Sequence, residues 1–213
     1  MKNALLVFVF SFFSVLSISA QGRQGSYYDV GRKSYFFGFG VKGNVYVNQY
    51  SVQDIEVWKN PAFGANVFVG NWFSRYMGAR LLFEGGKVKP YFQERTIMVD
   101  ENYVLSRFDL LYDLTNRICG CMYDRFYNVI PYAGVSGAYV FKAENRPDNA
   151  RKSTSLFFGV GLLNTFRMSS NLSAYLNLGL DLVDSKFDGS RSDRSDRKLN
   201  GIASATIGLK IDF

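Results

Sequence analysis

Alternation of apolar and polar side chains is the dominant pattern of this chain, and it is clearest in two stretches near the C-terminal end. Between Leu172 and Leu182, every second residue is Leu or Ala, and the residues between them are Ser, Tyr, Asn, Gly and Asp. The stretch from Gly201 to Phe213 repeats the pattern, with Ala, Ile, Leu and the final Phe on one side. Because successive side chains of a strand point to opposite faces, both stretches predict β-strands with one apolar face.

Six further stretches alternate in the same way and bring the number of predicted strands to eight. They cover residues 35–47, 63–73, 77–84, 105–114, 129–141 and 156–167. The alternation is blurred around Ser136 and Gly137, which predicts a β-bulge there. The connections after the first, third, fifth and seventh strands are long and charged, among them residues 85–103, whereas the other connections are generally shorter. The C-terminal strand would have unpaired backbone N–H and C=O groups along its edge, and we expect these groups to pair with the strand at residues 35–47.

The charges on the strands lie opposite the apolar faces, and this decides which way the sheet faces. Burying so many charges in a soluble core would cost several kcal/mol per ion unless they were paired. An outer-membrane barrel has an apolar outer wall, a polar interior, long outer loops and short periplasmic turns. The sequence therefore predicts an all-β protein, an eight-stranded antiparallel up-and-down transmembrane β-barrel, although charges solvated on the outside of a soluble sandwich also fit the alternation. The predicted lumen charge network comprises Lys42, Arg80, Glu84, Arg107, Asp109, Asp113, Asp181, Lys210 and Asp212.

The first twenty residues have the features of an export signal. Lys2 precedes an apolar run over residues 4–16, and the small residues Ser17 to Ala20 precede a polar Gln21. This is the pattern of a secretory signal peptide, and the run is shorter than the ~20 residues of a spanning helix. We expect residues 1–20 to be a cleaved signal peptide and residues 21–213 to form the barrel. No Cys follows the cleavage site, so no lipoprotein anchor is expected.

The composition argues against catalysis and against nucleic acid as a partner. The chain has no His, which removes Ser-His-Asp and Cys-His nucleophile systems and most zinc sites. Asp109 and Asp113 would share a strand face and could act as an acid–base pair, but with Arg107 beside them a lumenal ion-pair network is favoured. The net charge of +7 is modest and spread through polar connections, which favours anionic lipid head groups over nucleic acid. We expect no enzyme activity, no metal and no cofactor.

Two polar connections carry further candidate features. Cys119 and Cys121 are the only cysteines and fall in a predicted turn; a local disulfide and two free thiols both fit this spacing in an oxidising compartment. Residues 188–198 read D-G-S-R-S-D-R-S-D-R-K. This loop could contact lipopolysaccharide phosphates or a host surface through its arginines, although a solvated loop with balanced charges is the simpler interpretation.

Several segments together resemble the OmpA-type outer-membrane barrels. The segment N-W-F-S-R-Y-M-G-A-R-L at residues 71–81 looks like their strand–turn–strand signature, and residues 109–116, 119–120 and 125–135 are similar to the middle of that barrel. The last eight residues, T-I-G-L-K-I-D-F, fit the terminal assembly signal of such proteins at Thr206, Gly208, Ile211 and Phe213. The resemblance, which includes small OmpX-like members, implies a barrel recognised through its last strand by the outer-membrane assembly machinery. Larger members continue into a peptidoglycan-binding domain, whereas this chain ends at the barrel, so peptidoglycan anchoring is not implied.

The predicted location is the bacterial outer membrane, with a role in membrane integrity or surface interaction. An eight-stranded barrel is just wide enough for its own side chains, which disfavours a general porin. Two alternatives remain at this point: a narrow channel or small-ligand transporter, and a secreted soluble ligand-binding barrel. Lipopolysaccharide and outer-membrane lipids, the assembly machinery, and a host surface or small ligand bound by the long loops are the expected partners.

Overall fold

The structure is a computed structural model, and it describes residues 35–47, 61–89, 91–92, 97–98, 101–120, 125–143, 154–183 and 200–213. The predicted signal peptide at 1–20, the charged loop at 188–198 and Cys121 lie outside the described residues. The signal peptide, its cleavage and the domain boundary at residue 21 therefore stay predictions. Among the helices of the described part of the chain, none has the length and apolar character needed to cross a membrane.

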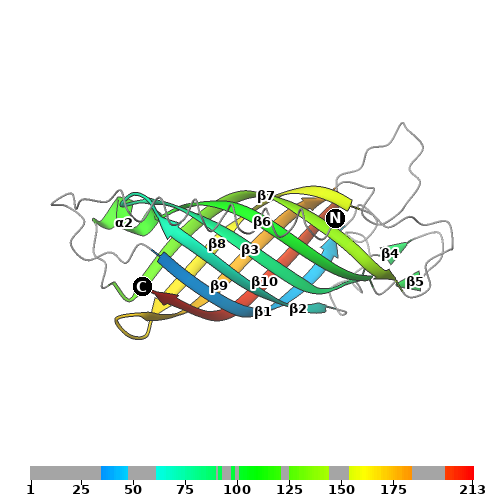
Figure 1. The fold of residues 1–213 in the computed structure, drawn as a ribbon, viewed down its shortest axis with the longest axis horizontal. Coiled ribbons are helices and arrows are strands. Elements are labelled where there is room, and N and C mark those ends of the chain that lie inside the picture. Colours follow the sequence, from blue (N-terminus) through cyan, green and yellow to red (C-terminus); the bar gives the residue numbers. More distant parts are fainter. Residues whose placement is uncertain are drawn as a thin grey trace, which may run out of the picture. The chain divides into compact units, whose positions relative to one another are not determined.

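Eight antiparallel strands close into one barrel in the order β1-β10-β9-β8-β7-β6-β3-β2, as the sequence predicts (Figure 1). Each strand pairs with its neighbours along the chain, and the barrel closes where β1 meets β10, which confirms the predicted partner of the C-terminal strand. A separate two-stranded ribbon, β4 (Tyr91–Phe92) and β5 (Ile97–Met98), lies in the connection between β3 and β6. The barrel strands are β1 (Tyr35–Val47), β2 (Ala62–Trp72), β3 (Met77–Val88), β6 (Glu101–Tyr112), β7 (Tyr127–Ala143), β8 (Thr154–Arg167), β9 (Leu172–Val183) and β10 (Asn200–Asp212).

The register fixes how far the strands tilt. Following paired residues once around the wall leads from Phe37 through every strand and back to β1 at Val47, ten residues further along. Closing eight strands with a stagger of this size requires a strand tilt of roughly 35–45°. Tilted strands of ~9 to 11 residues span a bilayer, so strands of 11 to 17 residues are long enough.

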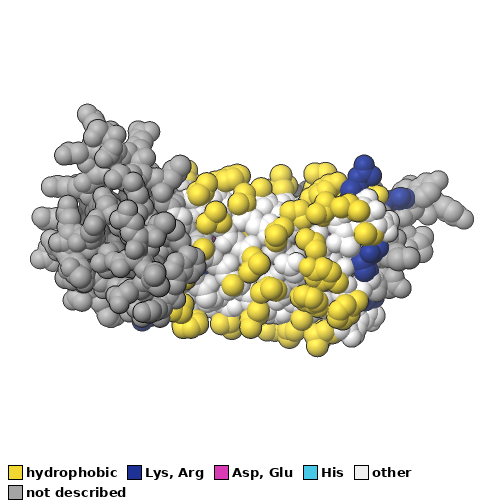
Figure 2. All heavy atoms as spheres, turned by 180° about the vertical axis from the view of Figure 1, so that it is seen from behind, with side chains coloured by type: hydrophobic (Ala, Val, Ile, Leu, Met, Phe, Trp, Pro, Cys, Tyr) yellow, Lys and Arg dark blue, Asp and Glu magenta, His cyan; other side chains and the backbone are white. Residues whose placement is uncertain are grey.

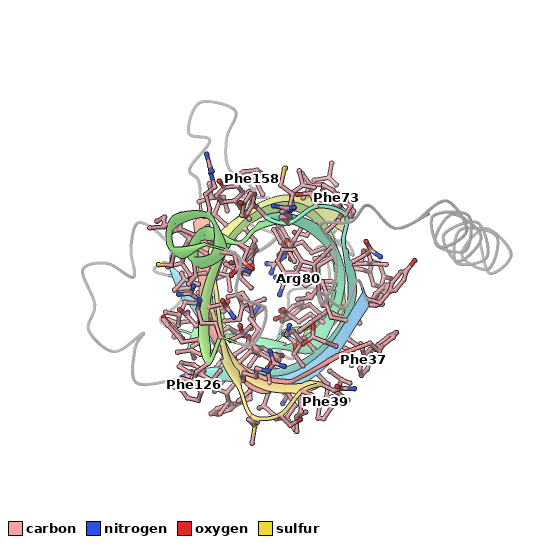
Figure 3. All side chains as sticks on the ribbon, turned by 90° about the vertical axis from the view of Figure 1, so that its left-hand side faces the viewer. Phe37, Phe39, Phe73, Arg80, Phe126 and Phe158 are labelled. Carbon is pink, nitrogen blue, oxygen red and sulfur yellow. The ribbon has the colours of Figure 1, made fainter. Side chains whose placement is uncertain are left out.

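The apolar face of each strand points outward, and the face with glycines and charges points inward. Phe37, Phe39 and Phe158 project away from the wall whereas Arg80 points into the lumen (Figure 3). Hydrophobic side chains cover the outer wall in the space-filling view (Figure 2). A soluble ligand-binding barrel would place these residues inside, so that alternative and the solvated sandwich are wrong.

The structure differs from the sequence prediction in three places. β3 runs to Val88 and β6 begins at Glu101, so the connection expected at residues 85–103 is partly strand. The register of β6 against β7 is regular at Ser136 and shifts between Asn102 and Tyr103, so the bulge lies near Phe141 rather than at Ser136 and Gly137. Residues 114–119 form a short helix, α2 (Leu114–Cys119), where a strand end and a turn were expected.

Candidate functional site

The lumen is the best-defined polar site of the described residues, and it has three layers along the barrel axis. The middle layer holds three basic and three acidic side chains that are almost fully buried: Lys42, Arg80, Arg107, Glu84, Asp109 and Asp181. On both sides of it, inward-facing residues near the strand ends are mainly apolar and buried. One apolar layer contains Tyr46, Val88, Tyr103, Phe157 and Ile202, and the other contains Phe36, Trp72, Leu111, Ile130 and Leu163.

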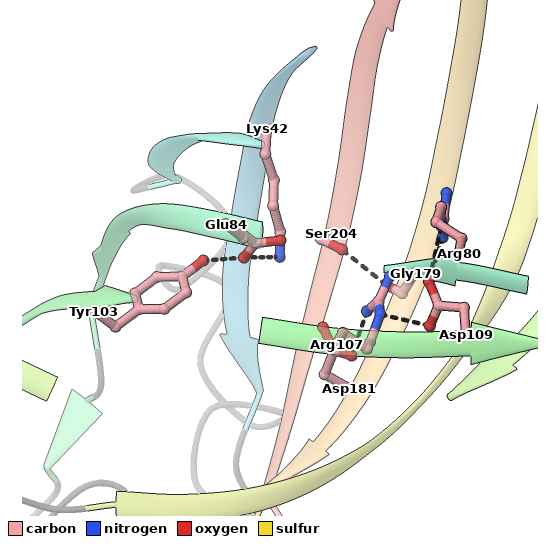
Figure 4. Close-up of polar contacts among 9 residues, drawn as sticks. All are labelled: Lys42, Arg80, Glu84, Tyr103, Arg107, Asp109, Gly179, Asp181 and Ser204. Atoms are coloured by element: carbon pink, nitrogen blue, oxygen red, sulfur yellow. Dashed lines mark hydrogen bonds and ion pairs between the residues drawn. The ribbon is translucent and has the colours of Figure 1, made fainter. Parts of the chain in front are cut away.

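Asp109 is the centre of the larger ion-pair network of the middle layer (Figure 4). One of its carboxylate oxygens accepts hydrogen bonds from Nε and Nη2 of Arg80, at 2.9 and 2.6 Å. Its other oxygen lies 2.8 Å from Nε of Arg107, whose Nη1 donates to Asp181 at 2.8 Å. The ring of Tyr132 lies against both guanidinium groups, 4.7 Å from Arg80 and 5.0 Å from Arg107. Each buried arginine is therefore compensated by carboxylates and by an aromatic face.

Glu84 is the centre of a second network, closer to the end of the barrel that carries the β3–β6 connection. Its carboxylate accepts a hydrogen bond from Lys42 Nζ at 2.5 Å and another from the hydroxyl of Tyr103. Asn44 in turn donates to the Tyr103 hydroxyl at 3.4 Å and to the carbonyl of Lys87 at 3.2 Å. All six charges of the middle layer thus have a charged partner, and the layer is electrically neutral.

Inward-facing glycines make the room that the large lumen side chains need. A Cβ at Gly161 would collide with the hydroxyl of Tyr132 and the Leu178 carbonyl, and a Cβ at Gly38 would collide with the ring of Phe68. At Gly134 it would collide with the carboxylate of Asp109. Adding side chains at these positions would therefore displace the residues that fill the lumen.

Three of the predicted network residues lie outside the middle layer. Lys210 and Asp212 form their own pair on β10, at 2.7 Å. Asp113 is not on a strand: it is the N-cap of α2, where its carboxylate accepts hydrogen bonds from the backbone N and Nδ2 of Asn116. The placement of Asp109 and Asp113 on one strand face, and with it the geometric basis for an acid–base pair, is therefore wrong.

Tyr103 and Tyr132 are both central to the lumen, although no sequence motif pointed to either residue. Tyr132 lies on the polar face of a predicted strand, and that position was the available signal; Tyr103 fell in the connection expected at residues 85–103, which hid its inward position on β6. The described residues contain no group of three or more His, Cys, Asp or Glu that could hold a metal ion.

Of the other predicted residues, Ile211, Phe213 and Cys119 lie near the end of the barrel that carries the C-terminus, whereas Thr206 pairs with Lys42 in the middle of the barrel. Phe213 exchanges two backbone hydrogen bonds with Tyr35, its ring stacks on that of Tyr35, and 61% of it is exposed. Along β10, Thr206 is buried whereas Ile211 and Phe213 face outward. Cys119 is exposed at the end of α2, and it has no disulfide partner among the described residues. The disulfide with Cys121 and the assembly signal stay predictions.

A closed barrel with an apolar outer wall and a neutral, ion-paired interior is an integral outer-membrane β-barrel of the small eight-stranded class, as the sequence predicts. No protein-family model matches the chain. It is 26% identical over 152 residues to outer membrane protein 40 of Porphyromonas gingivalis W83, a match that covers 70% of this chain and 39% of that protein. Outer membrane protein 41 of the same organism is also 26% identical over 152 residues.

Solved structures of outer-membrane proteins have the same fold. Neisserial surface protein A has a TM-score of 0.52 and 10% identity, with 84% of this chain and 97% of that chain covered. A major outer membrane protein from Thermus thermophilus has a TM-score of 0.51 and 14% identity, with 84% and 100% covered. The chain spans about two-fifths of the length of the curated relatives it matches, 39% and 38%. Location in the bacterial outer membrane follows from these relatives together with the fold.

Proposed function

We propose that this barrel has a passive role in the outer membrane, as a sealed structural element that contributes to membrane integrity and presents its loops at the cell surface. The observation that carries the proposal is the lumen: six buried charges with charged partners lie between two apolar layers. An ion or solute would have to break these pairs and displace the side chains of both layers. The absence of His and the ion pairing of Asp109 support a role without catalysis.

The passive role makes a prediction that a transport role does not. If the lumen charges only stabilise and specify the fold, an apolar pair of similar volume can replace one buried ion pair without loss of function. A channel or transporter that used Arg80 and Asp109 to contact a solute would lose activity on the same change. The Arg80→Met/Asp109→Leu double variant is therefore the diagnostic change.

The test is complementation in cells that lack the gene. We expect the deletion to increase the uptake of a hydrophobic dye, and both wild type and the double variant to restore exclusion when their levels in the outer membrane match. A double variant that assembles normally and fails to restore exclusion would contradict the passive role. A deletion strain with unchanged dye uptake, envelope stability and cell-surface properties would contradict the proposal as a whole.

The place where each proposed partner would bind depends on which end of the barrel faces the periplasm. Short connections mark the periplasmic end of an outer-membrane barrel and long ones the outer end. The β2–β3 and β8–β9 connections are four residues each, 73–76 and 168–171, and both lie at the end that carries the C-terminus. We infer that this is the periplasmic end, and that contacts with lipopolysaccharide, a host surface or a small ligand form at the other. Recognition of the last strand by the assembly machinery is part of the same proposal.

A further inference from the structure

α2 exposes an apolar and basic face at the inferred periplasmic end of the barrel. Asn116 is its buried residue, whereas Leu114, Arg117 and Ile118 are exposed and lie three and four residues apart, hence on one helix face. Ile118 is 72% exposed, and Phe126, at the entry to β7, is 68% exposed. Two large apolar side chains this exposed beside an arginine are typical of an element that lies in a membrane interface.

Three arginines, Arg75, Arg117 and Arg125, lie along this segment, and contacts tie two of them, Arg117 and Arg125, to its elements. The guanidinium of Arg117 lies 5.6 Å from the ring centre of Tyr76, which follows Arg75 in the β2–β3 turn. The backbone of the same turn holds the start of the helix, because Asp113 N donates to the Tyr76 carbonyl at 2.7 Å. On the other side, Arg125 donates from Nη2 to the carbonyls of Cys119 and Gly120, at 3.2 and 3.3 Å. The turn, α2 and the entry to β7 therefore form one continuous basic arc.

The described residues near this arc expose no acidic side chain. Asp113 is buried and caps the helix, and Asp212 is half-buried and bonded to Lys210. In the space-filling view, Lys and Arg side chains gather at this end of the barrel, and no Asp or Glu side chain is visible among the described atoms of that face (Figure 2). Asp124 precedes Arg125 in the sequence and lies outside the described residues. The exposed charge of the described arc is therefore positive.

We propose that this arc binds the phosphate groups of anionic phospholipids in the periplasmic leaflet of the outer membrane. Arginine matches phosphate oxygens with two parallel hydrogen bonds, and Arg75, Arg117 and Arg125 supply three guanidinium groups. Ile118 and Phe126 enter the adjoining acyl region. The side chains of Tyr127 and Asn164, which are hydrogen-bonded to each other at 2.8 Å on the outer wall, lie at the level of the headgroups. The inference goes beyond the sealed-barrel function, and it rests on the orientation proposed with that function, in which this end of the barrel is periplasmic.

The test measures which lipid the full-length folded protein retains. Wild-type protein is reconstituted in phosphatidylcholine nanodiscs that contain a minor fraction of phosphatidylglycerol, and native mass spectrometry then gives the ratio of the two lipids bound. We expect enrichment of phosphatidylglycerol in wild type. Removal of each positive charge near a membrane surface should lower this enrichment roughly fivefold at low salt, so the Arg75→Gln/Arg117→Gln/Arg125→Gln variant should approach the ratio of the bulk lipid.

Two control variants separate lipid recognition from folding. The triple Arg→Lys variant keeps the charge and should keep most of the enrichment, although it alters the contact of Arg125 with α2. Lys87→Gln removes an exposed charge at the other end of the barrel and should change nothing. Heat-modifiable gel mobility establishes that each variant is folded. Wild type without enrichment, or a folded triple Gln variant that retains it in full, would overturn the proposal.

Discussion

Removing the carboxylate of Asp109 tests the ion-pair network where it is most deeply buried. The side chains of Arg80 and Asp109 are both 0% exposed, and Arg80 has no other carboxylate within ion-pair distance among the described residues. Asp109→Asn keeps the shape and removes the charge, so the buried Arg80 guanidinium keeps a neutral amide and the rings of Phe68 and Tyr132 as neighbours but loses its anionic partner. Arg107 keeps its bond to Asp181, so one cation rather than two loses its partner.

The expected loss is at the lower end of the range for breaking a buried ion pair, about 3 kcal/mol. With a urea dependence of about 1–3 kcal/mol per M for the free energy of unfolding, the unfolding midpoint should fall by roughly 1–3 M. The measurement is urea unfolding of the barrel reconstituted in lipid vesicles, followed by the fluorescence of the buried Trp72 and by gel mobility.

The matched control is Arg80→Met/Asp109→Leu, which removes both charges together. Replacing a buried ion pair with apolar residues of similar volume is often neutral or stabilising, so the free energy of unfolding should stay within about 1 kcal/mol of wild type. An Asp109→Asn variant whose free energy of unfolding falls by less than ~1 kcal/mol would refute this reasoning. A double variant as unstable as Asp109→Asn would show instead that packing, not charge, decides the effect.

Three further predictions concern single positions. Gly161→Ala should destabilise the barrel by about 1–3 kcal/mol because the added methyl group displaces Tyr132, whereas Gly137→Ala, with no atom within 4 Å of the new Cβ, should be near neutral; equal unfolding midpoints would contradict this. Asp113→Ala should remove the cap of α2 and cost about 1 kcal/mol locally, seen as faster amide exchange in residues 114–119 with unchanged exchange in the strands. Deletion of Phe213 should lower assembly in cells more than it alters the refolded barrel, because the residue lies at the end of the wall; normal accumulation in the outer membrane would count against the assembly signal.

The barrel could be predicted from the sequence because the alternation of apolar and polar residues can be seen within each strand by itself. Alternation along each strand gives the two faces directly, and β1 begins and ends where the pattern does, at Tyr35 and Val47. The inward position of Lys42, Arg80 and Arg107 follows from the same alternation. β3 continues to Val88 through Gly85 and Gly86, where side chains that could alternate are missing, so its end was not visible in the sequence.

The pairing inside the lumen could not be predicted, because it depends on the register between strands. Arg107 bonds Asp181 across the lumen from a position 74 residues away, and alternation does not specify that distance. Asp113 continues the alternation of β6, but it lies beyond the end of the strand. Its backbone N–H donates to the Tyr76 carbonyl, and its carboxylate caps α2. The glycines that accommodate Tyr132 likewise lie on β8 and β9, far from it in sequence.

Electrical recording tests the sealed lumen most directly. Purified protein is reconstituted in lipid vesicles, heat-modifiable gel mobility establishes that it is folded there, and the same vesicles are then fused with a planar lipid bilayer. The paired charges and the two apolar layers predict no steady conductance at any protein concentration. A steady conductance that rises in proportion to the amount of inserted protein would contradict the sealed lumen and support a channel.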